Sequence, residues 1–249
     1  MGASPYGSTV IEVSPVFAKP RQNGHRLTIA RCFRFSYTRA MSPPLLSPGA
    51  ADALLFDLGR VVLDIDFNNT LARWAVDAGC TPADLAARFP RDETYRRHER
   101  GEISDAEFFA GLRTSLGVGL SDAQFLEGWN AIFIGEMPGI ALQLARAARR
   151  VPLYAFSNTN PAHAEYLTKA YAGVLGHFRE IFLSPAIGLR KPDTAAYDHV
   201  VKAIGVPAGR IVFFDDSADN IEGARNSGLQ AVHVTSPDDV AGALTALGF

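Results

Sequence analysis

The 249-residue chain is 47% hydrophobic and 20% charged, which fits a globular protein with a buried core and one large or two modest domains. Its net charge of −2 is uneven, because residues 1–50 carry six Lys and Arg against one Glu, or +5, which leaves −7 for the remainder. The body of the protein therefore has no general basic surface for nucleic acid, and no stretch reaches the roughly 20 apolar residues of a membrane span.

Residues 1–50 are predicted to form a poorly ordered extension, since they hold six of the 15 prolines and show no sustained helical or strand period. Their basic, acid-poor character is compatible with a targeting peptide, and Met41 offers the alternative of an upstream start that was mis-assigned. Cys32 and Cys80 lie in different regions and suggest no disulfide framework, so a reducing, cytoplasmic setting is expected.

The first predicted strand is the apolar run 53–56, which stops abruptly at Asp57. From about Phe67 the period of the sequence becomes helical. Apolar residues recur there at i, i+3, i+4 and i+7, namely Leu71, Trp74, Ala75 and Ala78. This spacing predicts a helix with one apolar face.

Two further helix starts follow, each marked by a capping box: Ser104 with Glu107, and Ser121 with Gln124. Residues 67–137 are therefore predicted to be a helical module inserted between the first and second strands of the core. At that point in the chain the module would lie beside the strand ends, where it can act as a lid.

From Pro138 onward the sequence predicts alternating helices and strands. The expected helices are 140–149, 161–172, 192–204, 219–227 and 237–246, and the expected strands are 151–156, 180–183, 211–214 and 231–234. This alternation predicts an α/β fold with a doubly wound parallel sheet, its core formed by residues 51–66 and 138–249.

Polar residues follow four of these apolar runs: Asp57, Ser157, Lys191 after a loop, and the pair Asp215–Asp216. In an open parallel sheet, ligands bind beyond the carboxyl ends of the strands, so these residues are expected to meet in one crevice. A carboxylate, a hydroxyl, an ammonium and an acidic pair together indicate phosphoryl transfer with a metal ion. Taken singly, each has an ordinary structural alternative, such as a turn, a cap or a surface position.

Adjacent carboxylates at 215 and 216 repel each other unless a cation offsets them, and Mg²⁺ suits such oxygen ligands. Lys191 precedes Pro192, a residue favoured at the first position of a helix, so its ammonium is expected near a helix N-terminus, where anions bind. The Ser157 hydroxyl and the amides of Asn158 and Thr159 are candidates to hold phosphoryl oxygens.

Four segments in this order resemble the haloacid dehalogenase superfamily of phosphohydrolases. They are Phe56-Asp57-Leu58-Gly59, Phe156-Ser157-Asn158-Thr159-Asn160, Arg190-Lys191-Pro192 and the run from Phe213 to Asn220. A narrower resemblance to bacterial α-D-glucose-1-phosphate phosphatases rests on residues 64–67, 98–104 and 213–224.

The resemblance implies that Asp57 is the nucleophile and that Mg²⁺ is held by Asp57, Asp216 and the carbonyl of Gly59, with Asp215 helping through water. It further implies that Ser157 and Asn158 bind the transferring phosphoryl group and that Lys191 neutralises it. The inserted helices match the family's cap. Candidate substrate contacts from the cap are His98, Glu99, Arg100 and Trp129.

One position departs from the family pattern. Most phosphatases of this superfamily carry a general-acid aspartate two residues after the nucleophile, where this chain has Gly59. Another group could protonate the leaving oxygen, the substrate could need little help, or catalysis could be impaired. An anomeric sugar oxygen is a better leaving group than an ordinary alkoxide, which favours a sugar 1-phosphate.

The sequence thus predicts an Mg²⁺-dependent phosphatase of a small phosphate ester, such as glucose 1-phosphate, acting through an aspartyl phosphate. The alternatives are a sugar-phosphate-binding or regulatory module that has lost turnover, and a haloacid dehalogenase, which uses an Asp nucleophile without Mg²⁺. Oligomeric state cannot be read from the sequence.

Overall fold

The computed structural model of the chain describes residues 46–249, so most of the predicted extension at 1–50 lies outside the described residues. Five parallel strands form a sheet in the order β5-β4-β1-β6-β7. They are β1 (Ala53–Phe56), β4 (Leu153–Ser157), β5 (Glu180–Leu183), β6 (Ile211–Asp215) and β7 (Gln230–His233). The predicted doubly wound α/β fold is confirmed, with strand bounds within two residues of those expected.

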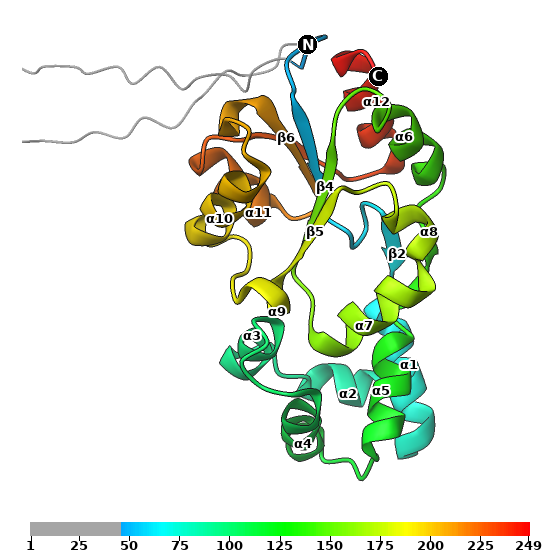
Figure 1. Cartoon of the computed structure of the whole chain (residues 1–249). Helices are drawn as coiled ribbons and strands as arrows, with labels where there is room; N and C mark the ends of the chain where they lie inside the picture. Colours follow the sequence, from blue (N-terminus) through cyan, green and yellow to red (C-terminus); the bar gives the residue numbers. More distant parts are fainter. Residues whose placement is uncertain (1–45) are drawn as a thin grey trace, which may run out of the picture. The chain divides into compact units, whose positions relative to one another are not determined.

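Helices cover both faces of this sheet (Figure 1). On one side are α6 (Ile140–Ala147), α7 (Pro161–Ala170), α8 (Ala172–Leu175) and α12 (Pro237–Leu247), and on the other are α10 (Thr194–Ile204) and α11 (Ala218–Asn226). The central strand β1 is buried throughout. Its Leu54 and Phe56 pack into one apolar cluster, whereas Ala53 and Leu55 pack into the other. Because alternate side chains of a strand point to opposite faces, one short run serves both halves of the core.

The inserted helices have an apolar core of their own. They are α1 (Phe67–Ala78), α2 (Pro82–Arg88), α3 (Glu93–Glu99), α4 (Asp105–Leu116) and α5 (Asp122–Asn130), and we call them the helical insert. Both predicted capping boxes are present, at Ser104 and Ser121. On α1 and α5, Trp74 and Trp129 stack with centroids 5.6 Å apart. A Cβ on Gly128 would lie 2.2 Å from the Trp74 ring, so only glycine lets these helices approach.

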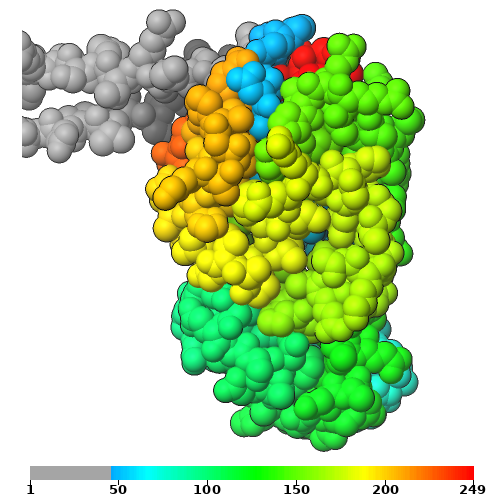
Figure 2. All heavy atoms as spheres, viewed as in Figure 1, coloured from blue at the N-terminus to red at the C-terminus, as the bar shows by residue number. Residues whose placement is uncertain are grey.

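A two-stranded antiparallel ribbon joins the insert to the core, and the sequence did not predict it. It pairs β2 (Leu63–Ile65) with β3 (Phe133–Glu136). Another unpredicted element is the short helix α9 (Ser184–Ile187) after β5. In Figures 1 and 2 the insert lies beyond one end of the sheet, below the ends of β4 and β5. No helix within residues 46–249 is long and apolar enough to cross a membrane.

Candidate active site

The polar residues predicted to converge do so at the carboxyl ends of the strands. Asp57 follows β1, Ser157 ends β4, and Asp215 ends β6. The Lys191 ammonium lies 2.8 Å from Asp57 Oδ1 and 2.6 Å from Asp215 Oδ2. It also donates to the carbonyl oxygen of Phe156, at 2.9 Å. One buried cation therefore links the ends of three adjacent strands.

Burial sets the electrostatics of this group. Desolvation raises the pKa of Asp57 from 3.8 to about 7, although the nearby Lys191 opposes the rise. Burial alone would lower the pKa of Lys191, but the two carboxylates beside it raise it above its usual value. Burial and the charge of Asp215 together raise the pKa of Asp216. The cluster thus carries an excess of negative charge that a second cation would relieve.

The carboxylates are suited to hold that second cation. Asp57, Asp215 and Asp216 each offer an oxygen, and these oxygens lie within 4.8 Å of one another. The two oxygens of Asp215 already accept bonds from Lys191, the Ser217 amide and the Asn220 side chain. Asp216 is freer, since its nearest cation is the Arg60 guanidinium at 3.8 Å. Oxygen donors of this kind match the preference of Mg²⁺.

Asn158 lines the cavity beside Ser157, and its side chain is bound to the backbone of Lys191. Its side-chain amide donates to the Lys191 carbonyl and its Oδ1 accepts from the Lys191 amide, both at 2.8 Å. These two hydrogen bonds hold the backbone of Lys191 in position. The backbone N–H of Asn158 is then the group of this residue that can meet a phosphoryl oxygen. The amide of Thr159 is also used, because it donates to Ser184 Oγ at 2.9 Å. Pro192 does not begin a helix, since α10 starts at Thr194.

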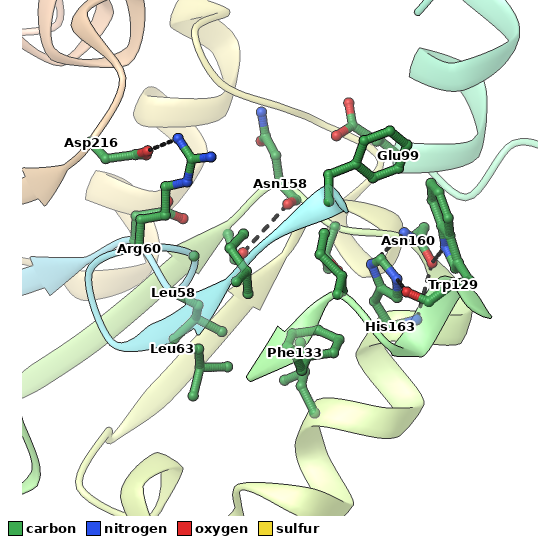
Figure 3. Close-up of a pocket in the computed structure, with 18 of the residues that line it drawn as sticks. Leu58, Arg60, Leu63, Glu99, Trp129, Phe133, Asn158, Asn160, His163 and Asp216 are labelled. Carbon is green, nitrogen blue, oxygen red and sulfur yellow. Dashed lines mark hydrogen bonds and ion pairs between the residues drawn. The ribbon is translucent and has the colours of Figure 1, made fainter. Parts of the chain in front are cut away.

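A cavity of about 290 Å³ opens above Asp57, between the core and the helical insert. Figure 3 shows Arg60 and Asp216 at one end and Trp129, Asn160 and His163 at the other. Of the predicted contacts from the insert, Glu99 and Trp129 line the cavity. Glu99 pairs with Arg190 of the core at 2.9 Å. Burial raises the pKa of Glu99, which Arg190 opposes.

His98 and Arg100, the other two predicted contacts from the insert, do not line this cavity. His98 is fully buried, stacks on Phe108, and bonds through Nε2 to Asp105 at 2.7 Å. The Arg100 guanidinium bonds to Glu93 and Glu102 and does not line the cavity. His98 is the residue before Glu99 on α3, and Arg100 is the C-cap of that helix.

Several residues that line the cavity were not predicted to do so, among them Tyr95, Asn160 and His163. Tyr95 lies four residues before Glu99 on α3, and this i, i+4 spacing places both on one face. Asn160 caps α7 and accepts from the His163 amide at 3.0 Å. An Asn before Pro161 is a recognisable helix start, so this signal was available in the sequence.

Stability of the metal-free protein should depend on pH through Asp57. The pKa of this carboxyl rises from 3.8 to about 7 on folding, so the folded state binds the proton more tightly than the unfolded state. The contribution of Asp57 to the free energy of unfolding is therefore greatest below pH 4 and is lost as the pH rises to 7. We expect the urea midpoint in EDTA to fall between pH 5 and pH 8, and an Asp57→Asn variant to lose much of that slope. A variant that keeps the whole slope would contradict the assignment.

Comparison with known proteins agrees with this geometry. Residues 51–228 match the family model of the haloacid dehalogenase-like hydrolases. The chain is 30% identical over 200 residues to drimenol cyclase drtB of Aspergillus calidoustus, covering 78% of this chain but only 36% of that protein. It is 27% identical over 186 residues to sesquiterpene phosphatase astK of Aspergillus oryzae, covering 74% of this chain and 89% of the other.

A similar solved structure is a haloacid dehalogenase (HAD) family enzyme, bt-2542 of Bacteroides thetaiotaomicron, determined in complex with magnesium and inorganic phosphate. The TM-score is 0.66 at 23% identity, with 75% of this chain and 95% of the other covered. The family match covers most of the chain, and it agrees with the shared fold and with the convergence of Asp57, Lys191 and Asp216. The chain belongs to the haloacid dehalogenase-like hydrolases and is an enzyme of that family.

Proposed function

We propose that this protein is an Mg²⁺-dependent phosphatase of a small phosphate monoester, with Asp57 as the nucleophile. The observation that carries the proposal is the Asp57 carboxylate at the floor of the cavity, with one oxygen held 2.8 Å from Lys191. Within residues 46–249 the other oxygen, Oδ2, accepts no hydrogen bond, so it is available to attack phosphorus. The named relative astK, a sesquiterpene phosphatase, supports this class of reaction.

The residues around Asp57 have distinct roles in the proposal. The Asp57 oxygen attacks the phosphorus, the ester oxygen leaves, and the resulting aspartyl phosphate is then hydrolysed. Lys191 offsets the charge of the carboxylate as it meets an anionic phosphate, and Asp215 fixes the lysine. The Ser157 hydroxyl and the backbone N–H of Asn158 would hold phosphoryl oxygens. The helical insert would exclude water from the cavity.

Asp57, Asp216 and the Gly59 carbonyl would hold Mg²⁺, with Asp215 acting through water. The ion, when bound, neutralises charge on the phosphoryl oxygens. The magnesium and phosphate present in the bt-2542 structure support this choice of metal for the fold. The cytoplasmic setting predicted from the sequence is part of the same proposal.

The general acid is missing from its usual position, and the structure puts an apolar group nearby. A Cβ built on Gly59 would lie 2.8 Å from Cδ1 of Ile65. A general acid typically raises the rate by about 10²–10⁴-fold. Without one, the ester oxygen departs unprotonated and carries a negative charge. We expect kcat for substituted phenyl phosphates to fall steeply as the leaving phenol becomes more basic. A flat dependence, measured with chemistry shown to be rate-limiting, would reveal an acid elsewhere.

The finer prediction of a sugar phosphate, such as glucose 1-phosphate, rests on the sequence resemblance and on the leaving-group argument. It enters the tests below as a defined substrate. Three measurements separate the phosphatase from an inactive binding module and from a dehalogenase.

The first is hydrolysis of p-nitrophenyl phosphate with Mg²⁺, after EDTA, and after Mg²⁺ is restored; the others are phosphate binding and turnover of a 2-haloacid. We expect turnover, its loss in EDTA and its recovery. Phosphate binding without turnover would support the binding module, and turnover of a 2-haloacid in EDTA would support the dehalogenase.

A further inference from the structure

The wall of the cavity above Asp57 is formed largely by apolar side chains. Ile65, Phe67, Ile132, Phe133 and Leu167 face it from the ribbon, the insert and α7. Ile132 is half-buried and belongs to none of the three apolar clusters of the described residues. Its side chain lines the cavity instead of packing into a core. At about 290 Å³ the cavity is at the small end of ligand sites.

The polar side chains at the far end of the cavity are already paired with one another. Trp129 Nε1 donates to Asn160 Oδ1 at 3.1 Å, and Asn160 Nδ2 donates to His163 Nδ1 at 3.0 Å. His163 Nε2 donates to the Trp129 carbonyl at 2.9 Å, which closes the network. Burial lowers the pKa of His163 to about 4, so the ring is neutral at pH 7. Within the described residues the network leaves one N–H of the Asn160 amide for a substrate hydroxyl, and any other bond here would displace one already made.

Trp129 is also unavailable as a stacking platform for a sugar ring. Trp74 stacks on it with centroids 5.6 Å apart, and His163 stacks on it at 4.8 Å. Trp129 is 2% exposed, so little of its ring is open to a substrate. The neighbouring Phe133 contacts the rings of His163, Tyr166 and Tyr171 and also forms part of the apolar wall of the cavity.

Few polar groups remain for a substrate rich in hydroxyls. Glu99 is held by Arg190 at 2.9 Å. The Tyr95 hydroxyl has no hydrogen-bond partner within residues 46–249 and offers one polar handle. Beside Gly59 the nearest side chain is the aliphatic end of Ile65. A polyol would lose its hydration here and recover few hydrogen bonds, whereas an apolar group would lose nothing.

We propose that the leaving group accepted by this site is an apolar alcohol or phenol, bound against Ile132 and Phe133, and not a sugar. The proposal rests on the phosphatase function above and names its substrate class. Phosphate esters of aryl or branched aliphatic alcohols are the chemical class that fits.

The test is a series of para-alkylphenyl phosphates, from hydrogen to butyl, in which the basicity of the leaving phenol barely changes. We expect kcat/KM with Mg²⁺ to rise up to about fourfold per methylene, equivalent to ~0.8 kcal/mol, until the cavity is filled. Glucose 1-phosphate should be a poorer substrate than the butyl ester. A flat or falling series, or a preference for glucose 1-phosphate, would overturn the proposal.

The binding of non-hydrolysable phosphonates tests the apolar site even if the protein hydrolyses none of these esters. With Mg²⁺ present, 4-butylbenzylphosphonate should bind more tightly than benzylphosphonate, measured by calorimetry; equal affinity would overturn the apolar site. Absence of hydrolysis together with this gain in affinity would count against the phosphatase and not against the pocket.

Ile132→Ser and Ile134→Ser form a matched pair of variants. Ile134 lies two residues further on, on β3, and is 55% exposed outside the cavity. We expect Ile132→Ser to reduce the ratio of kcat/KM between the butyl and unsubstituted esters by several-fold, and Ile134→Ser to leave that ratio unchanged. Equal effects of the two variants would contradict a role for Ile132 in the wall.

Discussion

Asp57→Asn is expected to lower kcat by at least about 10⁴-fold while the protein stays folded. The amide keeps the size of the side chain but cannot form an aspartyl phosphate, and loss of a nucleophile costs rates of this order. The substitution also removes a buried carboxylate whose pKa desolvation has raised, so the metal-free variant should be no less stable than the wild type near pH 8. Phosphate release and thermal unfolding in EDTA check the two parts.

Asp52→Asn is the matched control for this experiment. Asp52 lies just before β1, at the opposite end of the strand from Asp57, and forms an exposed pair with Arg210 at 2.6 Å. Its replacement should change kcat by less than about twofold, since exposed pairs contribute only about 0–1 kcal/mol. Comparable losses in the two variants would mean that Asp57 acts through the fold and not through the chemistry.

Lys191→Met is expected to destabilise the metal-free protein by about 3–5 kcal/mol, because it leaves two buried carboxylates without their cation. Methionine fills most of the same space between Phe156 and Phe213, whose rings now lie 5.2 Å from the ammonium. Without the lysine the pKa of Asp57 should rise further, so the deficit should shrink as pH falls from 7 to 5. Urea unfolding in EDTA at both pH values measures this.

Lys169→Met provides the comparison, since Lys169 is exposed and pairs with Glu165 one turn earlier on α7. Its loss should cost less than about 1 kcal/mol at either pH. Added Mg²⁺ should recover more stability in Lys191→Met than in Lys169→Met, because a bound cation offsets the same carboxylates. Equal stabilities of the two variants in EDTA would contradict the buried charge cluster.

The sheet and its catalytic edge could be predicted because parallel strands are short, apolar and buried on both faces. Strand β6 (Ile211–Asp215) is an example. Its run of apolar residues predicts a buried strand, and the aspartate at its end predicts the position of the site. The capping boxes at Ser104 and Ser121 were equally readable, since both partners of each box lie within four residues.

The ribbon of β2 and β3 was not predictable in the same way. Its strands are three and four residues long, only partly buried, and separated by the whole helical insert. The orientation of α3 was also undetermined, because a seven-residue helix has too few residues to define an apolar face. In the structure His98 bonds to Asp105, whereas Tyr95 shares the face of Glu99 and lines the cavity.

Rapid-quench mass spectrometry of the working enzyme tests the central proposal most directly. During turnover of p-nitrophenyl phosphate with Mg²⁺, acid quenching followed by digestion should yield a peptide that carries one phosphoryl group on Asp57. Finding that group on another residue, or full turnover in the Asp57→Asn variant, would contradict the proposal.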